Sequence, residues 1–346
     1  MKSLFSLGAA LLLAAAGQAQ AAPVKAVATF TVIADVVKQV GGDQVQVSSL
    51  VGPNGDPHAY EPTPTDAQAL KQADVVFMSG LHLEGWMDRL IKASGQARPP
   101  VVLSEGIKTR EMAEDEDEHG HADHDHDHGG IDPHVWNNPL NVVVYTRNVV
   151  KALSAVDSAD AATFKANGDR YIAELEALDR YAREQIGQVP KAKRKVLTSH
   201  DAFGYFADAY GVTFISPLGL STEAEASAQD VAKLIRQIKQ EHVATYFFEN
   251  SNDPRLVQQI AKASGAQPGG ELYVEALSPA DGPAPTYAAM FRYNVDTLVK
   301  AMKGGHGGSL VGWVERSEAQ QNEARVPRCQ DSTMGPSQPD LRRTGG

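Results

Sequence analysis

The chain has 346 residues, a formal net charge of −11 at pH 7 and one cysteine, Cys329. One cysteine excludes an internal disulfide, so stability must come from burial, and the length is sufficient for two domains of ordinary size. Eight acidic residues lie at positions 114–128, where no Lys or Arg occurs, so the rest of the chain is close to neutral. We expect no nucleic-acid partner, because the sequence has no basic stripe and no interleaved aromatic and basic residues.

The first 21 residues have the pattern of a secretory signal peptide: Lys2, an apolar run at 4–16, and Ala-Gln-Ala ending at Ala21. The apolar run is too short to anchor the chain across a bilayer. No cysteine follows the cleavage position, so a lipid anchor is not expected. The sequence therefore predicts an exported, soluble, periplasmic protein that begins at residue 22.

Short apolar runs then alternate with segments of helical periodicity. We expect strands at 24–28, 45–50, 75–78 and 101–103, and helices at 30–40, 65–70 and 83–92. Strands that alternate with helices indicate a parallel sheet. The segment 22–156 is therefore predicted to be an N-terminal α/β lobe, and it contains a His/Asp-rich loop at 114–130.

Two strongly helical segments follow, at 141–156 and 159–188. A helix of about thirty residues spans about 45 Å, which is more than one small domain needs. We interpret the segment 157–190 as a long linking helix, a rigid spine between two lobes.

A second alternation begins at residue 195. It predicts strands at 195–199, 212–215, 245–249 and 271–274, and helices at 202–209, 227–241, 255–264 and 287–302. The predicted fold class is thus α/β, with two Rossmann-like lobes (22–156 and 191–303), each a parallel sheet with flanking helices. Such folds bind ligands at the carboxyl ends of the strands. Residues 304–346 show no periodicity, and we expect a disordered or atypical tail without an assigned function.

One short phrase occurs twice, as Asp56-Pro57-His58 and Asp132-Pro133-His134. Proline fixes its own φ and extends the preceding residue, so each His projects from a stiffened turn. Rigid presentation of an imidazole suits a metal site, and we predict both His58 and His134 to be metal ligands. The two Asp residues either orient the neighbouring imidazoles or simply form the turns.

Two further candidates follow predicted strands of the second lobe. His200 ends the strand at 195–199 and would face the cleft between the lobes. The alternative is that its side chain only forms a hydrogen bond with a backbone group. Asp281 lies in the Pro-rich loop after the last strand, where Asp-Gly-Pro is also ordinary turn chemistry. Three His and one carboxylate would complete a tetrahedral zinc site. His82 and His242 are interpreted as structural or exposed.

The His/Asp-rich loop offers a second kind of metal site. Its imidazoles are His119, His121, His124, His126 and His128. Ordering a flexible loop costs entropy, so its affinity should be weaker than that of a preformed site. We predict an auxiliary role in capture or sensing, and the alternative is a solvated acidic loop.

Together these features resemble the metal-specific solute-binding proteins of bacterial ABC importers, the zinc and manganese cluster. The resemblance covers residues 24–303 and rests on the segments G-D-P-H-A-Y-E-P-T-P, D-P-H-V-W-N-N-P, T-S-H-D-A-F-G-Y-F and A-L-S-P-A-D-G-P-A-P-T-Y. It implies His58, His134 and His200 as ligands, and its zinc-binding branch implies Asp281 as the fourth. It also implies two lobes joined by one long helix.

The resemblance further implies an ABC permease at the inner membrane as the partner, and it allows a periplasmic zinc chaperone as a second one. We expect a monomer. A third imidazole in place of a carboxylate favours zinc over manganese. The predicted function is therefore capture of zinc in the cleft between the lobes and its delivery to the permease.

Two other classes of function remain open from the sequence. A zinc hydrolase has three protein ligands and an open fourth position, but no H-E-x-x-H segment is present and no free carboxylate is marked as a general base. We therefore do not expect an enzyme. A periplasmic zinc buffer or metallochaperone would use the His/Asp-rich loop as its main store, so it would lose most of its capacity without that loop.

Overall fold

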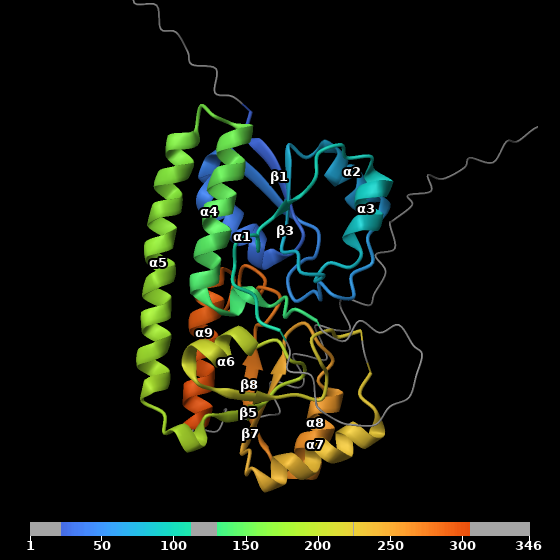
Figure 1. Cartoon of the computed structure of the whole chain (residues 1–346), viewed down its shortest axis with the longest axis vertical. Coiled ribbons are helices and arrows are strands. Elements are labelled where there is room, and N and C mark those ends of the chain that lie inside the picture. Colours follow the sequence, from blue (N-terminus) through green and yellow to red (C-terminus); the bar gives the residue numbers. More distant parts are fainter. Residues whose placement is uncertain (1–21, 112–129, 224, 305–346) are drawn as a thin grey trace, which may run out of the picture. The chain divides into compact units, whose positions relative to one another are not determined.

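Two four-stranded parallel sheets, each flanked by helices, form the fold (Figure 1). The computed structural model describes residues 22–111, 130–223 and 225–304. The predicted signal peptide, the five His residues at 119–128 and the predicted tail from 305 onward lie outside the described residues. The predicted α/β class with two sheets is confirmed.

The first sheet consists of β1 (Val24–Ala28), β2 (Val45–Ser49), β3 (Val75–Met78) and β4 (Val101–Val102), in the order β2-β1-β3-β4. Its helices are α1 (Thr31–Gly41), α2 (Pro64–Gln72) and α3 (Met87–Ser94). α1 forms because apolar residues recur at helical spacing, and Val32, Ile33, Val36, Val37 and Val40 are fully buried. α2 begins with a capping box between Thr63 and Asp66.

The second sheet repeats this topology. It consists of β5 (Lys195–Leu197), β6 (Thr213–Ile215), β7 (Thr245–Glu249) and β8 (Gln267–Leu272), in the order β6-β5-β7-β8. Its helices are α6 (Gly204–Tyr210), α7 (Ala228–Gln240) and α8 (Arg255–Ser264). Short 3₁₀ turns occur at Gly42–Gln44, Val135–Asn137 and Lys191–Lys193.

The position of β8 differs from the predicted strand at 271–274. The segment Gln267–Leu272 contains Pro268, Gly269 and Gly270, which are typical of a turn. An edge strand tolerates proline, and a Cβ on Gly269 would lie 2.5 Å from the Phe247 ring, so the glycine lets β8 approach β7. The sequence pattern therefore placed this strand several residues too late.

Three long helices run alongside the two sheets: α4 (Pro139–Val156), α5 (Ala161–Gly187) and α9 (Tyr287–Met302). α5 has 27 residues and is therefore about 40 Å long. It contacts α1 and α4 beside the first sheet, and α6 and α9 beside the second. Its buried stripe contains Phe164, Tyr171, Leu175, Leu178, Ala182 and Ile186. Within the described ranges, no helix is long and apolar enough to cross a membrane.

The main hydrophobic core runs through both halves without a break. It includes Val27 of β1, Leu175 of α5, Phe206 of α6 and Phe291 of α9. A smaller core lies in the second half and includes Leu197, Ile238 and Ile260. A continuous apolar core between two sheets resists large relative motion, because separation would expose it to water.

Candidate metal centre

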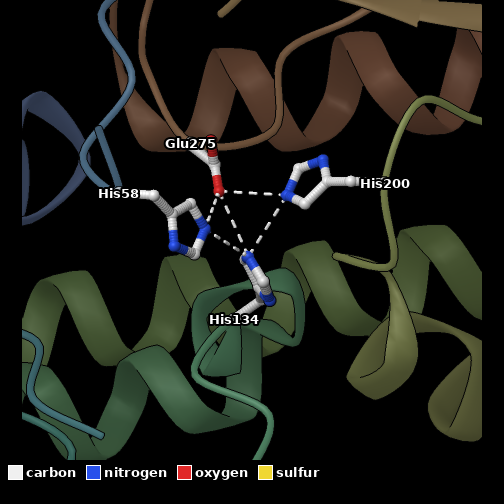
Figure 2. A group of neighbouring side chains, drawn as sticks. All are labelled: His58, His134, His200 and Glu275. Carbon is white, nitrogen blue, oxygen red and sulfur yellow. Dashed lines mark hydrogen bonds and ion pairs between the residues drawn. The ribbon is translucent and has the colours of Figure 1, made fainter. Parts of the chain in front are cut away.

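Four side chains from distant parts of the sequence converge at the carboxyl ends of the strands (Figure 2). His58 lies in the loop after β2 and His134 follows β4, whereas His200 and Glu275 are each the third residue after a strand, β5 and β8. Each half of the molecule thus contributes two of them. The predicted convergence of the three His residues is present in the structure.

The atoms that face one another are three imidazole nitrogens and one carboxylate oxygen. Glu275 Oε1 lies 2.7 Å from His58 Nε2 and 3.1 Å from Nε2 of both His134 and His200. His134 Nε2 lies 3.1 Å from His58 Nε2 and 3.3 Å from His200 Nε2. All four atoms fall within 4.8 Å of one another, which is the spacing of donors around one metal ion.

The group is almost completely buried. His134, His200 and Glu275 are 0% exposed, and His58 is 7% exposed. Burial of a carboxylate and three clustered imidazoles costs free energy unless a cation is bound, because buried polar and charged groups need an interaction that replaces their hydration. Burial of such a group therefore points to a bound cation.

The loop that carries His58 is fixed by its own sequence and by one tryptophan. Asp56 Oδ1 accepts a hydrogen bond from the His58 backbone N–H at 2.8 Å. The Trp86 indole N–H donates to the Pro57 carbonyl at 2.7 Å. Asp56 makes no hydrogen bond to the His58 ring and instead accepts from Thr222, so it acts as a turn residue.

The other two imidazoles are oriented by buried carboxylates. Asp132 Oδ1 lies 2.9 Å from His134 Nδ1, and Glu249 Oε2 lies 2.5 Å from His200 Nδ1. A carboxylate accepts, so each ring donates from Nδ1, and Nε2 is the atom left for a metal ion once no proton occupies it. Asp132 thus orients His134, which was one of the two readings of the sequence. Glu249 was not anticipated.

Hydrogen bonds and neighbouring charges together outweigh the effect of burial on the pKa values of the group. Burial alone would lower the pKa of His134, but hydrogen bonds with Asp132 and Glu275 raise it. Burial would likewise lower the pKa of His200, but the charges of Glu249 and Glu275 raise it well above its usual value. Burial is the largest single contribution and would raise the pKa of Glu275, but the charges of His200 and His58 and the hydrogen bonds from His134 and His200 together lower it well below its usual value. Glu275 is therefore an anion, and protons or a metal cation compete for the space beside it.

Asp281, the predicted fourth ligand, is not part of this group. It is exposed at the tip of a turn in which Ser278 N–H donates to Ala284 and Gly282 N–H donates to Pro279. Asp281 is therefore exposed, whereas Glu275 is buried and is the carboxylate that the structure groups with the three imidazoles. Glu275 directly follows the predicted strand at 271–274, the same signal that identified His200. His82 and His242 are exposed, as expected.

The molecule has two α/β halves, and a buried group of metal-binding residues lies between them at the carboxyl ends of their strands. This arrangement is typical of a solute-binding protein for a metal ion. The chain belongs to the family described as zinc-uptake complex component A, periplasmic, whose model matches residues 26–301. This agrees with the resemblance read from the sequence. Members of this family are the periplasmic metal-binding components of ABC importers, which work with a membrane permease and an ATPase.

Individual relatives carry the names of different metals. The chain is 32% identical to the iron-binding protein YfeA of Yersinia pestis over 276 residues, 80% of this chain and 85% of that one. It is 31% identical to the manganese-binding lipoprotein MntA of Bacillus subtilis, over 83% of this chain and 92% of that one. The periplasmic zinc-binding protein TroA of Treponema pallidum superimposes with a TM-score of 0.74 at 31% identity, over 81% of this chain and 99% of that one. The family therefore establishes metal binding, and the choice of metal is a separate question.

Proposed function

We propose that the protein is a high-affinity zinc carrier of the periplasm that delivers its cargo to an ABC permease. The ligands are His58, His134, His200 and Glu275. The observation that carries the proposal is the convergence of three Nε2 atoms and one Oε1 atom within 4.8 Å in a buried position.

The donor set supports zinc over manganese or iron. Imidazole suits zinc, whereas manganese prefers shells rich in oxygen. Only Oε1 of Glu275 faces the group, and Oε2 lies 3.4 Å from the Ser251 hydroxyl instead. The protein thus offers three nitrogens and one oxygen, the number that tetrahedral zinc takes.

The same count argues for a carrier rather than a hydrolase. A catalytic zinc keeps one position open for water, whereas four protein donors close the shell. Closed coordination in a cleft between two halves fits capture followed by release at a partner. The continuous core beside α5 supports a small motion between the loaded and empty states.

The remaining sequence predictions complete the proposal. A signal peptide at 1–21 would export the chain, and the mature protein would act as a monomer. The His/Asp-rich loop at 114–130 would bind zinc weakly. Removal of this loop distinguishes a carrier from a zinc buffer, because a carrier would keep its tight site whereas a buffer would lose most of its zinc capacity.

Titration of the mature protein, ending at Lys303, with zinc against a chromophoric chelator tests the ligand set. Glu275→Gln should weaken zinc binding more than 100-fold, because even partners that only orient a metal ligand cost 10–100-fold when changed. Asp281→Asn is the matched control and should bind like the wild type. Equal losses in both variants, or a loss in Asp281→Asn alone, would refute the assignment.

Competition tests the choice of metal. Zinc-loaded protein dialysed against a large excess of Mn²⁺, and separately against Fe²⁺ without oxygen, should retain its zinc as measured by mass spectrometry of the metal content. Loss of zinc to either metal in this dialysis would refute zinc as the preferred cargo and leave the metal-carrier class intact.

A further inference from the structure

Arg110 connects the metal centre to the opposite half of the molecule. Its Nη1 lies 3.2 Å from Oδ2 of Asp132, the carboxylate that orients His134. Its Nε lies 3.1 Å from Asp208 Oδ2 on α6, a helix of the second half. One guanidinium therefore bonds at once to the buried carboxylate that holds His134 and to a helix of the second half.

Both oxygens of Asp132 have fixed partners. Oδ1 accepts from the backbone N–H and the ring Nδ1–H of His134, and Oδ2 accepts from Arg110. Asp132 is 0% exposed, so Arg110 is its neutralising charge as well as its second anchor. A carboxylate held at both oxygens has one orientation, and that orientation decides where the His134 ring points.

A tyrosine repeats the connection between the halves. Tyr205 of α6 donates its hydroxyl to the Asp132 carbonyl at 2.9 Å, and it accepts from the Arg110 backbone N–H at 3.1 Å. Arg110 and Asp132 are also paired directly, since the Asp132 N–H donates to the Arg110 carbonyl. Hydrogen bonds with Tyr205 and between their own backbones therefore hold Arg110 and Asp132 next to α6.

A glycine makes room for this pair. A Cβ on Gly204, the first residue of α6, would lie 1.9 Å from Arg110 Nη1 and 2.5 Å from Asp132 Oδ2. Real Cβ atoms do not approach other atoms so closely, so any side chain at 204 would displace the ion pair. The start of α6 is thus shaped to accept the guanidinium against the carboxylate.

We propose that Arg110 is a positioning residue for the cargo: it holds Asp132 so that His134 presents Nε2 to the metal, and its bond to Asp208 makes this hold depend on contact between the two halves. Separation of the halves at the permease would then loosen His134 together with the cleft. The inference rests on the proposed function, because zinc is the cargo used to test it.

Zinc affinity and the rate of zinc release into excess chelator are measured for the wild type, Arg110→Ala, Arg110→Lys and Gly204→Ala. Arg110→Ala should raise the Kd about tenfold, mainly through faster dissociation. Arg110→Lys should recover part of the loss, because an ammonium still reaches Asp132. Gly204→Ala should resemble Arg110→Ala although it changes no charge.

Arg170→Ala is the matched control. Arg170 lies near Glu174 and donates to the Gln39 carbonyl on α1, so this variant also removes a charge and a contact between elements, but away from the metal centre. It should release zinc like the wild type. The thermal midpoint of each zinc-free variant separates loss of fold from loss of positioning.

Wild-type Kd and release rate in both Arg110→Ala and Gly204→Ala would overturn the positioning role, and so would a lower zinc-free midpoint with unchanged zinc release. If Arg110→Ala does not fold, Gly204→Ala and Arg110→Lys decide the question in the same way. Weak zinc binding by the wild type itself would instead refute the proposed function, so the two failures are distinguishable.

Discussion

Glu249 is the residue whose change is most informative about the centre, because it touches a ligand and not the metal. Its Oε1 accepts from the backbone N–H groups of Ser199 and His200, at 2.9 and 3.2 Å. Its Oε2 accepts from His200 Nδ1 and from the Asn252 amide, each at 2.5 Å. All four partners are donors, so this position requires an acceptor at both oxygens.

Glutamine has the same shape but one acceptor and one donor. Whichever way the amide of Glu249→Gln turns, its NH₂ group faces donors: either His200 and Asn252, or two backbone N–H groups. The least costly relief is transfer of the His200 proton to Nε2, which removes the lone pair from the metal. Changes of this kind lower metal affinity 10–100-fold, about 1.4 to 2.7 kcal/mol of binding free energy.

The assay is competition for zinc with a chelator of known affinity, at pH 7.5, on Glu249→Gln and on Glu241→Gln. Glu241 is a partly exposed partner of Lys195, so its variant makes the same chemical change away from the centre. We expect weaker zinc binding in the first variant alone, with a zinc-free thermal midpoint still above the assay temperature. Wild-type zinc affinity in a folded Glu249→Gln protein would refute the reasoning from the tautomer.

Three further predictions concern stability, each measured by denaturant unfolding of the zinc-free protein. Burial raises the pKa of Glu271 to about 7, although a hydrogen bond with Tyr273 lowers it. The free energy of unfolding of the wild type should therefore fall by about 2 to 3 kcal/mol as the pH rises from 4.5 through 7, because the folded state binds the proton more tightly than the unfolded one. Glu271→Gln should not show this loss, and parallel pH profiles of the two proteins would contradict the prediction. A Cβ on Gly168 would lie 2.5 Å from a methyl of Val150. Gly168→Ala should therefore destabilise the α4–α5 contact by about 1 to 2 kcal/mol, although alanine has the better helix propensity. A gain in stability would show that α4 and α5 can shift to accept the methyl group. Thr63→Ala should cost about 1 kcal/mol because it removes the N-cap of α2, and an unchanged midpoint would argue against the capping box.

Local patterns predicted most of the elements correctly. β1, β3 and β7 begin and end at the predicted residues, because each is a short apolar run between helical segments. α9 is likewise as predicted, at Tyr287–Met302. These elements are determined by periodicity within a few neighbours, which a sequence displays directly.

Two of the His residues were recognisable for a similar reason. His58 and His134 each follow a proline that constrains the backbone over two or three residues. His200 was recognisable from its place after a strand. The prediction of convergence then needed only the rule that parallel strands end at one edge of a sheet.

The fourth position depends on which loops meet, and the sequence does not display that. Asp281 and Glu275 are six positions apart in one segment after β8, and both are acidic. Asp281 is exposed in a turn held by backbone hydrogen bonds, whereas Glu275 is buried next to three imidazoles. The bond between Glu249 and His200 joins residues 49 positions apart, so it too was beyond local reasoning.

The equal division of donor atoms between the two halves has a mechanical consequence. A metal ion held by two donor atoms from each half is a coordination cross-link, and for zinc its bonds of about 2 Å would tolerate little stretching. Part of the binding free energy is therefore cohesion between the halves, so the loaded protein should withstand shear between them better than the empty one. Unloading, in turn, requires a shift of only an ångström or so, which a pair of lobes braced by a 27-residue helix can still supply.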